Sequence, residues 1–443
     1  MRIDRVEIEN FKKFSDYTLD LHPQFTLLVG DNGTGKTTIL DALAIAAGIW
    51  LVNSPDTTLN NSRRNILPSE IRLEAIESDT ITQFIERKPV QIKAIGTINS
   101  QPVQWLRQIK TNGSRTSNTE AKKALEIIST LFQQVEAGEK IWLPIVAYYG
   151  AGRAWLPSNQ RDDPKATTHT SPARRWDAFY DCFKERIRIA DLHTWFQKEA
   201  IASVNRQGQM RPGYKVVKFA ILRCIPNADD LWFDPERSEI VVSIQGNPQP
   251  FSNLSAGQKM MVGLIADIAI KIVTQNASFL SEESDIERQK LPLILQETPG
   301  LVLIDEIDVH LHPKWQRQVV KDLTTTFPSI QFVCTSHSPL VIGEVEASCI
   351  RVLERDEETG KVISTIPLES YGLDANRILE EQMGSSERNK DVANKLHALF
   401  RLIDDENFEG ARQAMIPLGE KIGHQAPEIT QARSLIKFLE GNE

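Results

Sequence analysis

The sequence has little cysteine and no long apolar run, and each shortage excludes a class of protein. Its four cysteines lie far apart and form no Cys-x-x-Cys pair, which excludes a disulfide framework and a zinc site of paired thiolates. No stretch approaches the roughly 18 consecutive apolar residues of a membrane helix. The first residues also lack the apolar core of a signal peptide. We therefore expect a cytoplasmic protein with no membrane partner.

The chain also lacks an excess of basic charge. Its 51 Lys and Arg residues are outnumbered by 59 Asp and Glu residues, and the net charge of −8 excludes a protein that coats nucleic acid over its whole surface. Residues 153–215 are the exception, with 12 basic against 7 acidic side chains and interleaved aromatic residues. This segment predicts either contact with nucleic-acid phosphates or a solvated helix face above an ordinary aromatic core.

What is present is an alternation of short apolar strands and amphipathic helices, which is typical of an α/β sheet core. Strands are predicted over residues 25–29, 90–110 (a pair), 141–149, 216–225, 240–244, 301–304 and 330–335. Helices are predicted over residues 36–51, 119–136, 172–205, 254–273 and 315–325. From about Tyr371 the apolar residues follow helical spacing, so the tail either caps the sheet domain or forms an oligomer or partner surface.

A glycine-rich octapeptide, Gly30 to Thr37, matches the phosphate-binding pattern GxxxxGK[ST] without a mismatch. It follows a predicted strand and opens a predicted helix, the context in which backbone N–H groups and a helix N-terminus hold phosphates. Lys36 can reach the β- and γ-phosphates, and Thr37 can hold Mg²⁺ through its hydroxyl. We expect the ATP-binding residues of this loop to be Asp31, Asn32, Gly33, Thr34, Gly35, Lys36, Thr37 and Thr38.

A second apolar strand, residues 301–304, delivers two carboxylates at its C-terminal end, Asp305 and Glu306. Phosphoryl transfer depends mainly on positioning and charge stabilisation. Asp305 is therefore predicted to bind Mg²⁺ together with Thr37, and Glu306 to orient and polarise the attacking water. The two motifs together predict an ATP hydrolase that uses ATP and Mg²⁺.

Two further motifs resemble the ABC ATPase superfamily. Leu254-Ser255-Ala256-Gly257-Gln258 resembles its LSGGQ signature, with alanine in place of the first glycine, and Thr335-Ser336-His337 stands where that family has its switch histidine. Ile8–Phe14, Asp305–Pro313 and Ser336–Pro339 are similar to motifs of the SMC, RecF and OLD-like branch. The resemblance implies an α/β fold, an ABC-type ATPase head of mixed sheet and flanking helices, with a helical insertion and a C-terminal helical appendage.

The resemblance also assigns residues and partners. In this branch two heads sandwich two ATP molecules, which implies a homodimer or a higher homo-oligomer. The signature of one subunit would cap the γ-phosphate that Lys36 of the other subunit binds. The signature residues are Ser255, Ala256, Gly257 and Gln258. The implied catalytic residues are Glu306, His337 and Lys36, and the further ATP contacts are Lys12 and Lys13.

Within this branch the chain resembles a compact subgroup. The stretch between Gly150 and Val216 is too short for a coiled-coil arm, and no Asp-x-Asp cluster of an OLD-type nuclease follows His337. Tyr148–Trp155 and Ser370–Leu379 resemble the PtuA-like ATPases found beside HNH nucleases in Septu and retron-linked anti-phage systems. The resemblance implies an ATPase that controls a separate HNH-type nuclease in antiviral defence and is not a nuclease alone.

Partners and alternative functions complete the expectation. The nucleic-acid partner would be DNA or retron RNA/DNA. A RecF-like repair and recombination ATPase is the alternative function, and the Asn10-Phe11-Lys12 motif and the long insertion disfavour the ATP-binding subunit of a transporter. We divide the chain into a P-loop lobe (1–150), a basic helical insertion (151–215), a lobe with signature, acidic strand and switch (216–350), and a C-terminal strand with a helical tail (351–443).

Overall fold

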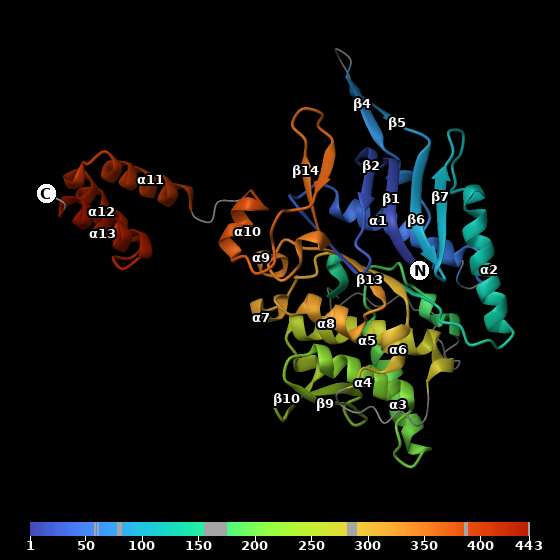
Figure 1. Ribbon diagram of the computed structural model, residues 1–443. Helices are drawn as coiled ribbons and strands as arrows, with labels where there is room; N and C mark the ends of the chain where they lie inside the picture. Colours follow the sequence, from blue (N-terminus) through green and yellow to red (C-terminus); the bar gives the residue numbers. More distant parts are fainter. Residues whose placement is uncertain are drawn as a thin grey trace. The chain divides into compact units, whose positions relative to one another are not determined.

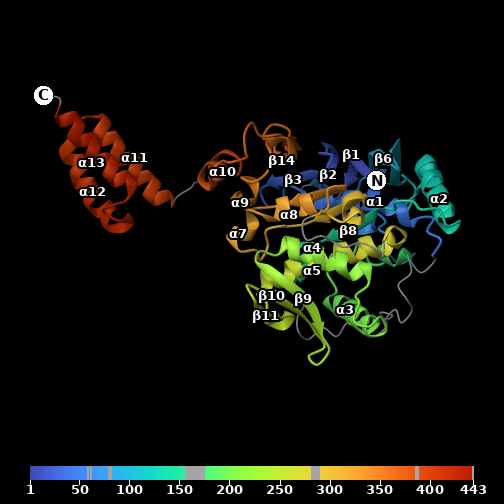
Figure 2. The ribbon, with the colours of Figure 1, turned by 60° about the horizontal axis from the view of Figure 1, so that its bottom comes forward.

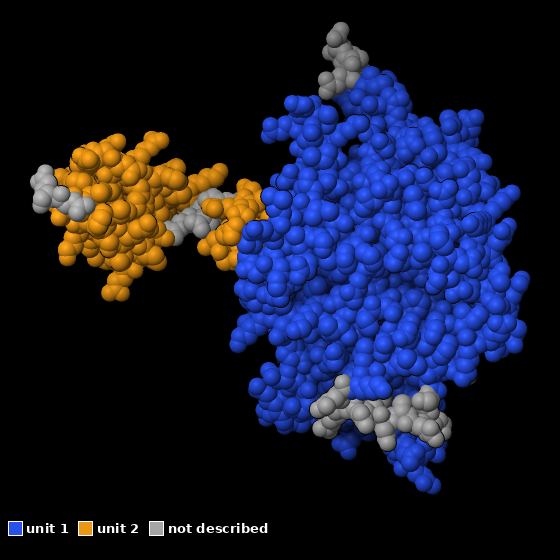
Figure 3. Space-filling view, in the orientation of Figure 1, with its two compact units in different colours: residues 1–373 blue, residues 374–443 orange. Residues whose placement is uncertain are grey.

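The structure is a computed structural model that describes residues 1–56, 59, 62–77, 82–154, 175–280, 290–384 and 389–441. The chain forms two compact units, Met1–Leu373 and Asp374–Glu443, which are coloured separately in Figure 3. No helix among the described residues is long and apolar enough to cross a membrane.

A six-stranded sheet forms the centre of the first unit, in the order β15-β14-β3-β13-β12-β8. Its strands are β3 (Phe25–Gly30), β8 (Ile145–Tyr149), β12 (Gly300–Ile304), β13 (Ile330–Thr335), β14 (Ile350–Arg355) and β15 (Val362–Thr365). All pairs are parallel except β14–β15. The inner strands are apolar runs buried on both faces, as parallel sheets require.

The register of this sheet gathers polar residues at one edge. Tyr149, Ile304 and Cys334 lie level with one another at the carboxyl ends of β8, β12 and β13. The residues that come next along the chain therefore meet at a single edge of the sheet. In open α/β sheets this carboxyl edge is where ligands bind.

A second, antiparallel sheet covers helix α1 (Lys36–Ala47) on its other side (Figure 1). Its order is β2-β1-β6-β7, and its strands are β1 (Arg2–Phe11), β2 (Phe14–Asp20), β6 (Val90–Ile98) and β7 (Gln101–Ile109). The β6 side chains alternate between buried and half-buried, which is typical of a sheet with one face on the core. Because α1 contacts strands of both sheets, it is buried from Ile39 onward.

The remaining elements of the first unit are helices and two small sheets. The helices are α2 (Lys122–Glu136), α3 (Ile189–Val204), α4 (Pro212–Cys224), α5 (Ala256–Gln275), α6 (Leu293–Glu297), α7 (Pro313–Gln316), α8 (Val319–Thr326) and α9 (Pro339–Ile342). The strands are β4 (Leu73–Glu77), β5 (Thr82–Glu86), β9 (Ala228–Asp234), β10 (Glu239–Ile244) and β11 (Asn247–Pro250). Helices α4 and α5 lie side by side, with β9 and β10 next to α4 (Figure 2).

The predicted strand over residues 216–225 is wrong, because this segment is helix α4. Pro212 stands in the first turn, where its missing N–H costs nothing, and the buried residues recur at helical spacing. The β-branched residues Val216 and Val217 favour a strand by their own propensity, but the helical spacing of the buried residues outweighs it. The predicted helix over 172–205 is too long: within its described part only α3 and a 3₁₀ turn, Arg175–Phe179, are helical.

The second unit is helical, as the tail pattern predicted. It contains α10 (Ala375–Glu381), α11 (Lys390–Asp404), α12 (Phe408–Ile422) and α13 (Pro427–Glu440). The last three helices bury their apolar stripes against one another around Leu399, Ile403, Ala411 and Ala432. Their amphipathic pattern is therefore explained by a small core of their own.

Candidate functional site: a P-loop at the carboxyl edge of the sheet

The glycine-rich loop links the end of β3 to the start of α1. Gly33 and Gly35 adopt left-handed φ values of 82° and 108°. A Cβ on Gly35 would come within 2.6 Å of the Phe14 ring, so only glycine fits this closing position. The loop leaves the free N–H groups of the first turn of α1 directed at the space above it, which is the requirement for holding phosphate.

Lys36 lies folded over this loop. Its Nζ donates hydrogen bonds to the carbonyl oxygens of Gly30 at 2.7 Å and Asp31 at 3.1 Å. The pKa of Lys36 is lowered, because burial outweighs the opposing effect of the nearby carboxylates of Asp305, Asp31 and Glu306. The ammonium is thus held at the loop by weak carbonyl partners, which an anion can replace.

Asp305 is fixed by two hydroxyl groups from different elements. The Thr37 hydroxyl on α1 donates to Oδ2 at 2.9 Å, and the Thr335 hydroxyl at the end of β13 donates to Oδ1 at 2.6 Å. The Asp305 N–H donates to the Tyr149 carbonyl at 2.8 Å. The structure therefore brings together Thr37 and Asp305, which lie 268 residues apart in the chain. That these two residues hold Mg²⁺ stays a prediction.

Glu306 stands in a strained backbone turn. Its φ is +50°, a left-handed value that costs a residue with a Cβ about 1–2 kcal/mol. The Glu306 N–H donates to the Thr335 hydroxyl at 2.7 Å, and the Ile307 N–H donates to the Thr335 carbonyl at 2.9 Å. Such strain persists where the surroundings over-determine it, and this occurs most often at functional sites.

Sequence reasoning missed one buried residue at this site, Arg153. Its guanidinium donates to the carbonyl oxygens of Gly150 at 3.2 Å, Asp305 at 2.5 Å and Glu306 at 2.9 Å. The side chain is only 2% exposed, and burial lowers its pKa. The sequence did offer one signal, because Arg153 comes four residues after a buried strand. That strand lies next to the strand of Asp305 and Glu306 in the sheet, although the two are far apart in the chain.

His337 follows β13 at the same edge, and its neighbours are firmly held. The Ser336 hydroxyl donates to Asp308 Oδ1 at 2.6 Å, and the Ser338 hydroxyl donates to Gln316 Oε1 at 2.6 Å. Among the described residues no hydrogen bond to the His337 ring is formed, and the ring is half-buried. The backbone of the switch is thus fixed while the imidazole remains available.

The two N-terminal lysines differ in their contacts. Lys13 donates from Nζ to the Gly33 carbonyl, so it lies on the P-loop, and burial followed by repulsion from Arg355 lowers its pKa. Lys12 instead turns to Asp41 on α1, with 2.5 Å between Nζ and Oδ2. The structure brings Lys13 to the nucleotide loop and does not bring Lys12 there.

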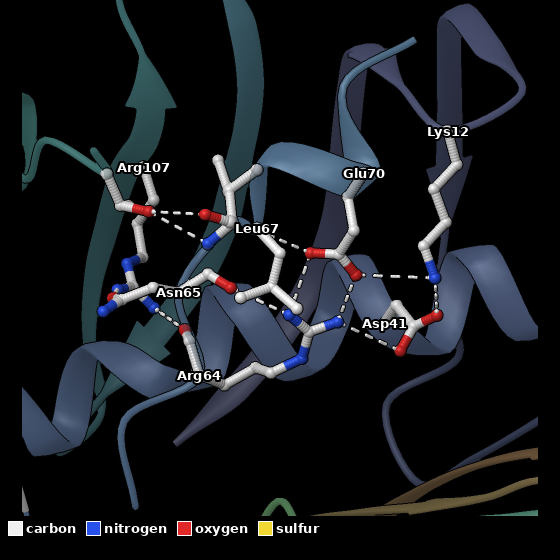
Figure 4. A network of polar contacts seen from close by, with 9 residues as sticks. Lys12, Asp41, Arg64, Asn65, Leu67, Glu70 and Arg107 are labelled. Carbon is white, nitrogen blue, oxygen red and sulfur yellow. Dashed lines mark hydrogen bonds and ion pairs between the residues drawn. The ribbon is translucent and has the colours of Figure 1, made fainter. Parts of the chain in front are cut away.

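Lys12 belongs to the polar network shown in Figure 4. Its Nζ lies 3.4 Å from Glu70, and Arg64 pairs with the same two carboxylates, at 2.5 Å from Glu70 and 3.3 Å from Asp41. Two cations and two buried anions therefore satisfy one another beside α1, which carries Asp41. This arrangement gives Lys12 a structural task, which is to tie the β1–β2 turn to the P-loop helix.

The signature residues form the start of helix α5. Ser255 and Gln258 make a reciprocal capping box, with the Gln258 N–H donating to the Ser255 hydroxyl at 3.3 Å and the Ser255 N–H donating to Gln258 Oε1 at 2.8 Å. Gly257 packs so closely that a Cβ would lie 2.4 Å from the His310 carbonyl oxygen. Ser255 and Ala256 are exposed, and within the described part of the chain no hydrogen bond or ion pair joins them to Lys36 or Asp305.

Mg²⁺ fits the oxygen pair of Thr37 and Asp305 on chemical grounds. Magnesium takes one or two protein oxygens and completes its shell with water and substrate phosphates. No cluster of three or more His, Cys, Asp or Glu side chains that could hold a metal alone exists among the described residues. His310 and His312, which alternate along the chain as a pair of metal ligands could, each have a structural place: His312 caps α7 through Nδ1, and His310 sits in a left-handed turn.

The basic segment lies partly outside the described residues, from 155 to 174. In its described part Lys184 lies 2.8 Å from Asp181, Arg188 lies 3.4 Å from Asp191, and Arg211 lies 3.3 Å from Glu199. Its aromatic residues pack in cores, for example Trp176 against Phe132 and Trp195 against Tyr214. These contacts favour the interpretation of a solvated helix face over a core, and nucleic-acid contact stays a prediction.

Comparison with known proteins agrees with this geometry. Two family models described as AAA domain match residues 5–207 and 187–343, and the second also names an AbiEii toxin of a type IV toxin–antitoxin system. The "Retron Vc95 probable ATPase" of Vibrio cholerae is 24% identical, over 86% of this chain and 79% of the relative. The Septu protein PtuA of Bacillus thuringiensis is 22% identical, over 94% of this chain and 93% of the relative.

Two more distant likenesses were found. The repair protein RecF of Staphylococcus epidermidis is 27% identical over 109 residues, which is 24% of this chain and 29% of that protein. The SMC head domain from Thermotoga maritima is 13% identical with a TM-score of 0.44, over 82% of this chain and 99% of that one. The fold class follows from the sheet order and the motifs, and not from this last likeness.

The parallel sheet, the P-loop at its carboxyl edge and the acidic strand define the class of protein. The chain has the fold and the motifs of an ATP hydrolase, and two AAA-domain models match its residues 5–207 and 187–343. Along most of its length it resembles the ATPases of retrons and the PtuA proteins of Septu systems.

Proposed function

We propose that two copies of this chain close around ATP, hydrolyse it, and thereby control a separate HNH-type nuclease in antiviral defence. The observation that carries the proposal is the fixed arrangement at the sheet edge. Thr37 and Asp305 are hydrogen-bonded to each other, and the Glu306 backbone is locked beside them. This arrangement supports hydrolysis, as opposed to nucleotide binding alone.

Each residue at this edge has a task in the proposed reaction. Lys36 and the N–H groups of the loop bind the β- and γ-phosphates, and Thr37 and Asp305 hold Mg²⁺, which supplies charge neutralisation when bound. Glu306 orients the attacking water and accepts its proton. His337 lies at the same edge, and its ring has no hydrogen bond to any described residue, so it can hydrogen-bond to the γ-phosphate.

The second copy completes the site in this proposal. Ser255 and Ala256 at the start of α5 are exposed, and among the described residues no hydrogen bond or ion pair joins them to the P-loop of the same chain. Helix N-termini attract phosphate, and α5 is 20 residues long. We infer that the α5 N-terminus of one copy caps the γ-phosphate held by Lys36 of the other.

The antiviral role rests on similarity to relatives. Retron and Septu ATPases match this chain over 81–94% of its length. The chain itself offers no separate cluster of metal-binding side chains in the described residues, so the nuclease of such a system would be another subunit. We infer that the second unit, which has its own core, contributes to assembly or to capture of that partner.

The experiment is a comparison of the full chain with a chain ending at Gly384. Both should bind ATP, because the first unit contains the whole P-loop edge, and neither should cut plasmid, single-stranded DNA or tRNA with Mg²⁺ or Mn²⁺. Only the full chain should assemble or retain the HNH subunit, measured by light scattering and co-purification. Cleavage by the full chain alone, or unchanged assembly of the shortened chain, would contradict the proposal.

A RecF-like role in DNA repair is the second candidate, because the local match to RecF includes about a quarter of the chain. Such a protein would bind gapped DNA in an ATP-dependent manner and act without a nuclease subunit. Binding to gapped duplexes should therefore be measured beside co-purification of an HNH subunit. Tight, ATP-dependent binding to gaps without such a subunit would favour repair.

A further inference from the structure

We propose that Arg153 is a positioning residue for hydrolysis: its guanidinium holds the backbone turn that aims the Glu306 carboxylate. The proposal rests on the proposed function, in which Glu306 orients the attacking water. It gives a task to the stretch Tyr148–Trp155, which the motifs of the ATPase head do not explain.

The guanidinium joins the ends of two neighbouring strands. Arg153 follows β8 in a 3₁₀ turn, Ala151–Ala154, and its Nη1 donates to the carbonyl of Gly150 in the same turn. Nη1 also donates to the Asp305 carbonyl, and Nη2 donates to the Glu306 carbonyl at 2.9 Å. No other side chain of the described residues donates to these two acidic-residue carbonyls. Arg153 is therefore the side-chain link between the β8 exit and the acidic turn after β12.

The turn needs such a link because it is held in a left-handed conformation at Glu306. Its N–H groups are bound on one side by the hydroxyl and carbonyl of Thr335. Its carbonyl groups are bound on the other side by Arg153. The Glu306 carbonyl also accepts the Val309 N–H at 3.1 Å. Both peptide groups that flank the Glu306 side chain are thus fixed, so the direction in which this side chain leaves the backbone is set by these contacts, of which Arg153 makes the side-chain ones to the carbonyls.

A buried arginine at this position lowers the stability of the fold, which suggests that the site requires it for another reason. The side chain is 2% exposed. Among the described residues its Nε has no hydrogen-bond partner, and its hydrogen bonds go to uncharged carbonyl groups. A buried guanidinium with these partners reduces stability compared with an apolar residue. Its planar fork reaches these carbonyls from two nitrogen atoms in fixed directions, whereas lysine would have to donate from a single nitrogen atom.

The conservative variant Arg153→Lys separates positioning from folding. It should lower kcat for ATP by at least about tenfold, because a small misplacement of a catalytic group has large effects on rate. The dissociation constant for ATP should stay within about threefold, since the P-loop and Lys36 are untouched. Arg153→Gln, which is shorter and neutral, should show a larger fall of kcat with the same retention of binding.

A matched control exists in Arg351 on β14. It is also buried, at 7% exposed, and its guanidinium donates to the carbonyls of Asp20, Ser348 and Ile350. Arg351→Lys therefore removes the same kind of fork from the same sheet without touching the acidic turn. It should leave kcat within about twofold of the unmodified chain.

A double-mutant comparison tests whether Arg153 acts through Glu306. In a Glu306→Gln chain, single-turnover hydrolysis should fall by no more than about twofold further when Arg153→Lys is added, because residues that act as a unit are not additive. A purely structural role predicts the same fall in both backgrounds.

Different results would overturn the positioning role of Arg153 and the proposed function. Unchanged kcat in Arg153→Lys and Arg153→Gln, an equal fall in the Glu306→Gln background, or loss of ATP binding together with kcat in both Arg153 variants would each overturn the positioning role. Full hydrolysis by Glu306→Gln alone would overturn the task assigned to Glu306, and with it the proposed function.

Discussion

The P-loop edge and the signature helix of this chain differ in how their polar groups are satisfied. At the P-loop edge, residues from distant parts of the sequence are bonded to one another: Thr37 to Asp305, Asp305 to Thr335, and Arg153 to the acidic turn. At the signature helix, the side chains of Ser255 and Gln258 each accept a hydrogen bond from the other residue's N–H, and neither bonds to a distant part of the described chain. The first region is assembled by the fold of one chain, and the second is a self-capped, exposed helix start.

This difference indicates which half of the site depends on a second molecule. A buried network has to be satisfied within the chain that buries it, because unpaired buried polar groups are costly. An exposed helix N-terminus needs no partner to be stable, since water and its own cap satisfy it. A substitution at the P-loop edge should therefore alter the ATP site within the copy that carries it. A substitution at the signature helix should alter turnover only when two copies are assembled.

The largest effect is expected at Glu306. Glu306→Gln should bind ATP normally and hydrolyse it at least about a hundredfold more slowly, because one general base contributes about two to four orders of magnitude. Phosphate release and equilibrium ATP binding measure the two properties. The control is Glu344→Gln, which removes a half-buried glutamate paired with Arg317 and should leave turnover within about twofold. Normal turnover in Glu306→Gln would contradict the role of Glu306 in orienting the attacking water.

The next effect is expected at the signature helix. Ser255→Arg should lower turnover at least about tenfold at concentrations where copies assemble, because a bulky cation at an exposed helix start blocks close approach of a phosphate-bearing partner. ATP binding by the single chain should stay within about threefold. Loss of the cap also lowers stability by about 1 kcal/mol, so Ser255→Thr, which keeps the hydroxyl, is the matched control. Equal turnover in both variants would contradict a role for the exposed helix start.

A smaller contrast is expected between the neighbours Lys12 and Lys13. Lys13→Ala should weaken ATP binding by about three- to tenfold, because it removes a cation that contacts the P-loop. Lys12→Ala should leave binding nearly unchanged and lower the free energy of unfolding by about 1 kcal/mol, because Asp41 and Glu70 keep Arg64. Titration calorimetry and denaturant unfolding read the two effects. The reverse pattern would show that Lys12 is the nucleotide contact.

The smallest effect is expected away from both regions, at Asp322 on α8. Burial raises the pKa of this carboxyl from 3.8 to about 6. Between about pH 4 and 6 the folded chain therefore holds a proton that the unfolded chain has lost, so this group lowers stability as pH rises through that window. Asp322→Asn should be more stable by about 1 kcal/mol above pH 6, equally stable near pH 4, and unchanged in turnover. Thermal unfolding from pH 4 to 8 tests this sign.

Much of the P-loop edge was predictable from sequence, because each of its motifs is local. Gly30 to Thr37 and the strand before Asp305 have patterns of their own, and the strands and helices that present them were found as predicted. The contact between Thr37 and Asp305 followed from the general rule that carboxyl ends of parallel strands share an edge.

The contacts of Arg153 and Lys12 could not be predicted from local sequence motifs. Arg153 is one of 12 basic residues in its segment, and only the parallel pairing of β8 with β12 brings it to the acidic turn. Lys12 and Lys13 are adjacent and chemically alike, yet a positive φ of 48° at Lys12 sends its side chain to α1. Such information lies in tertiary pairing and backbone geometry, which local patterns do not carry.

The measurement that tests the central claim most directly is a mixing experiment with two inactive variants, Lys36→Ala and Ser255→Arg. Each alone should hydrolyse ATP very slowly, because one lacks the phosphate-binding lysine and the other lacks a usable signature helix. In an equal mixture, half of the pairs formed at random join the two variants. Each such pair has one intact site made from the P-loop of one copy and the signature helix of the other. Turnover should therefore return to about a quarter of that of the unmodified chain. No recovery in the mixture, or normal turnover by Ser255→Arg alone, would contradict a site shared between two copies.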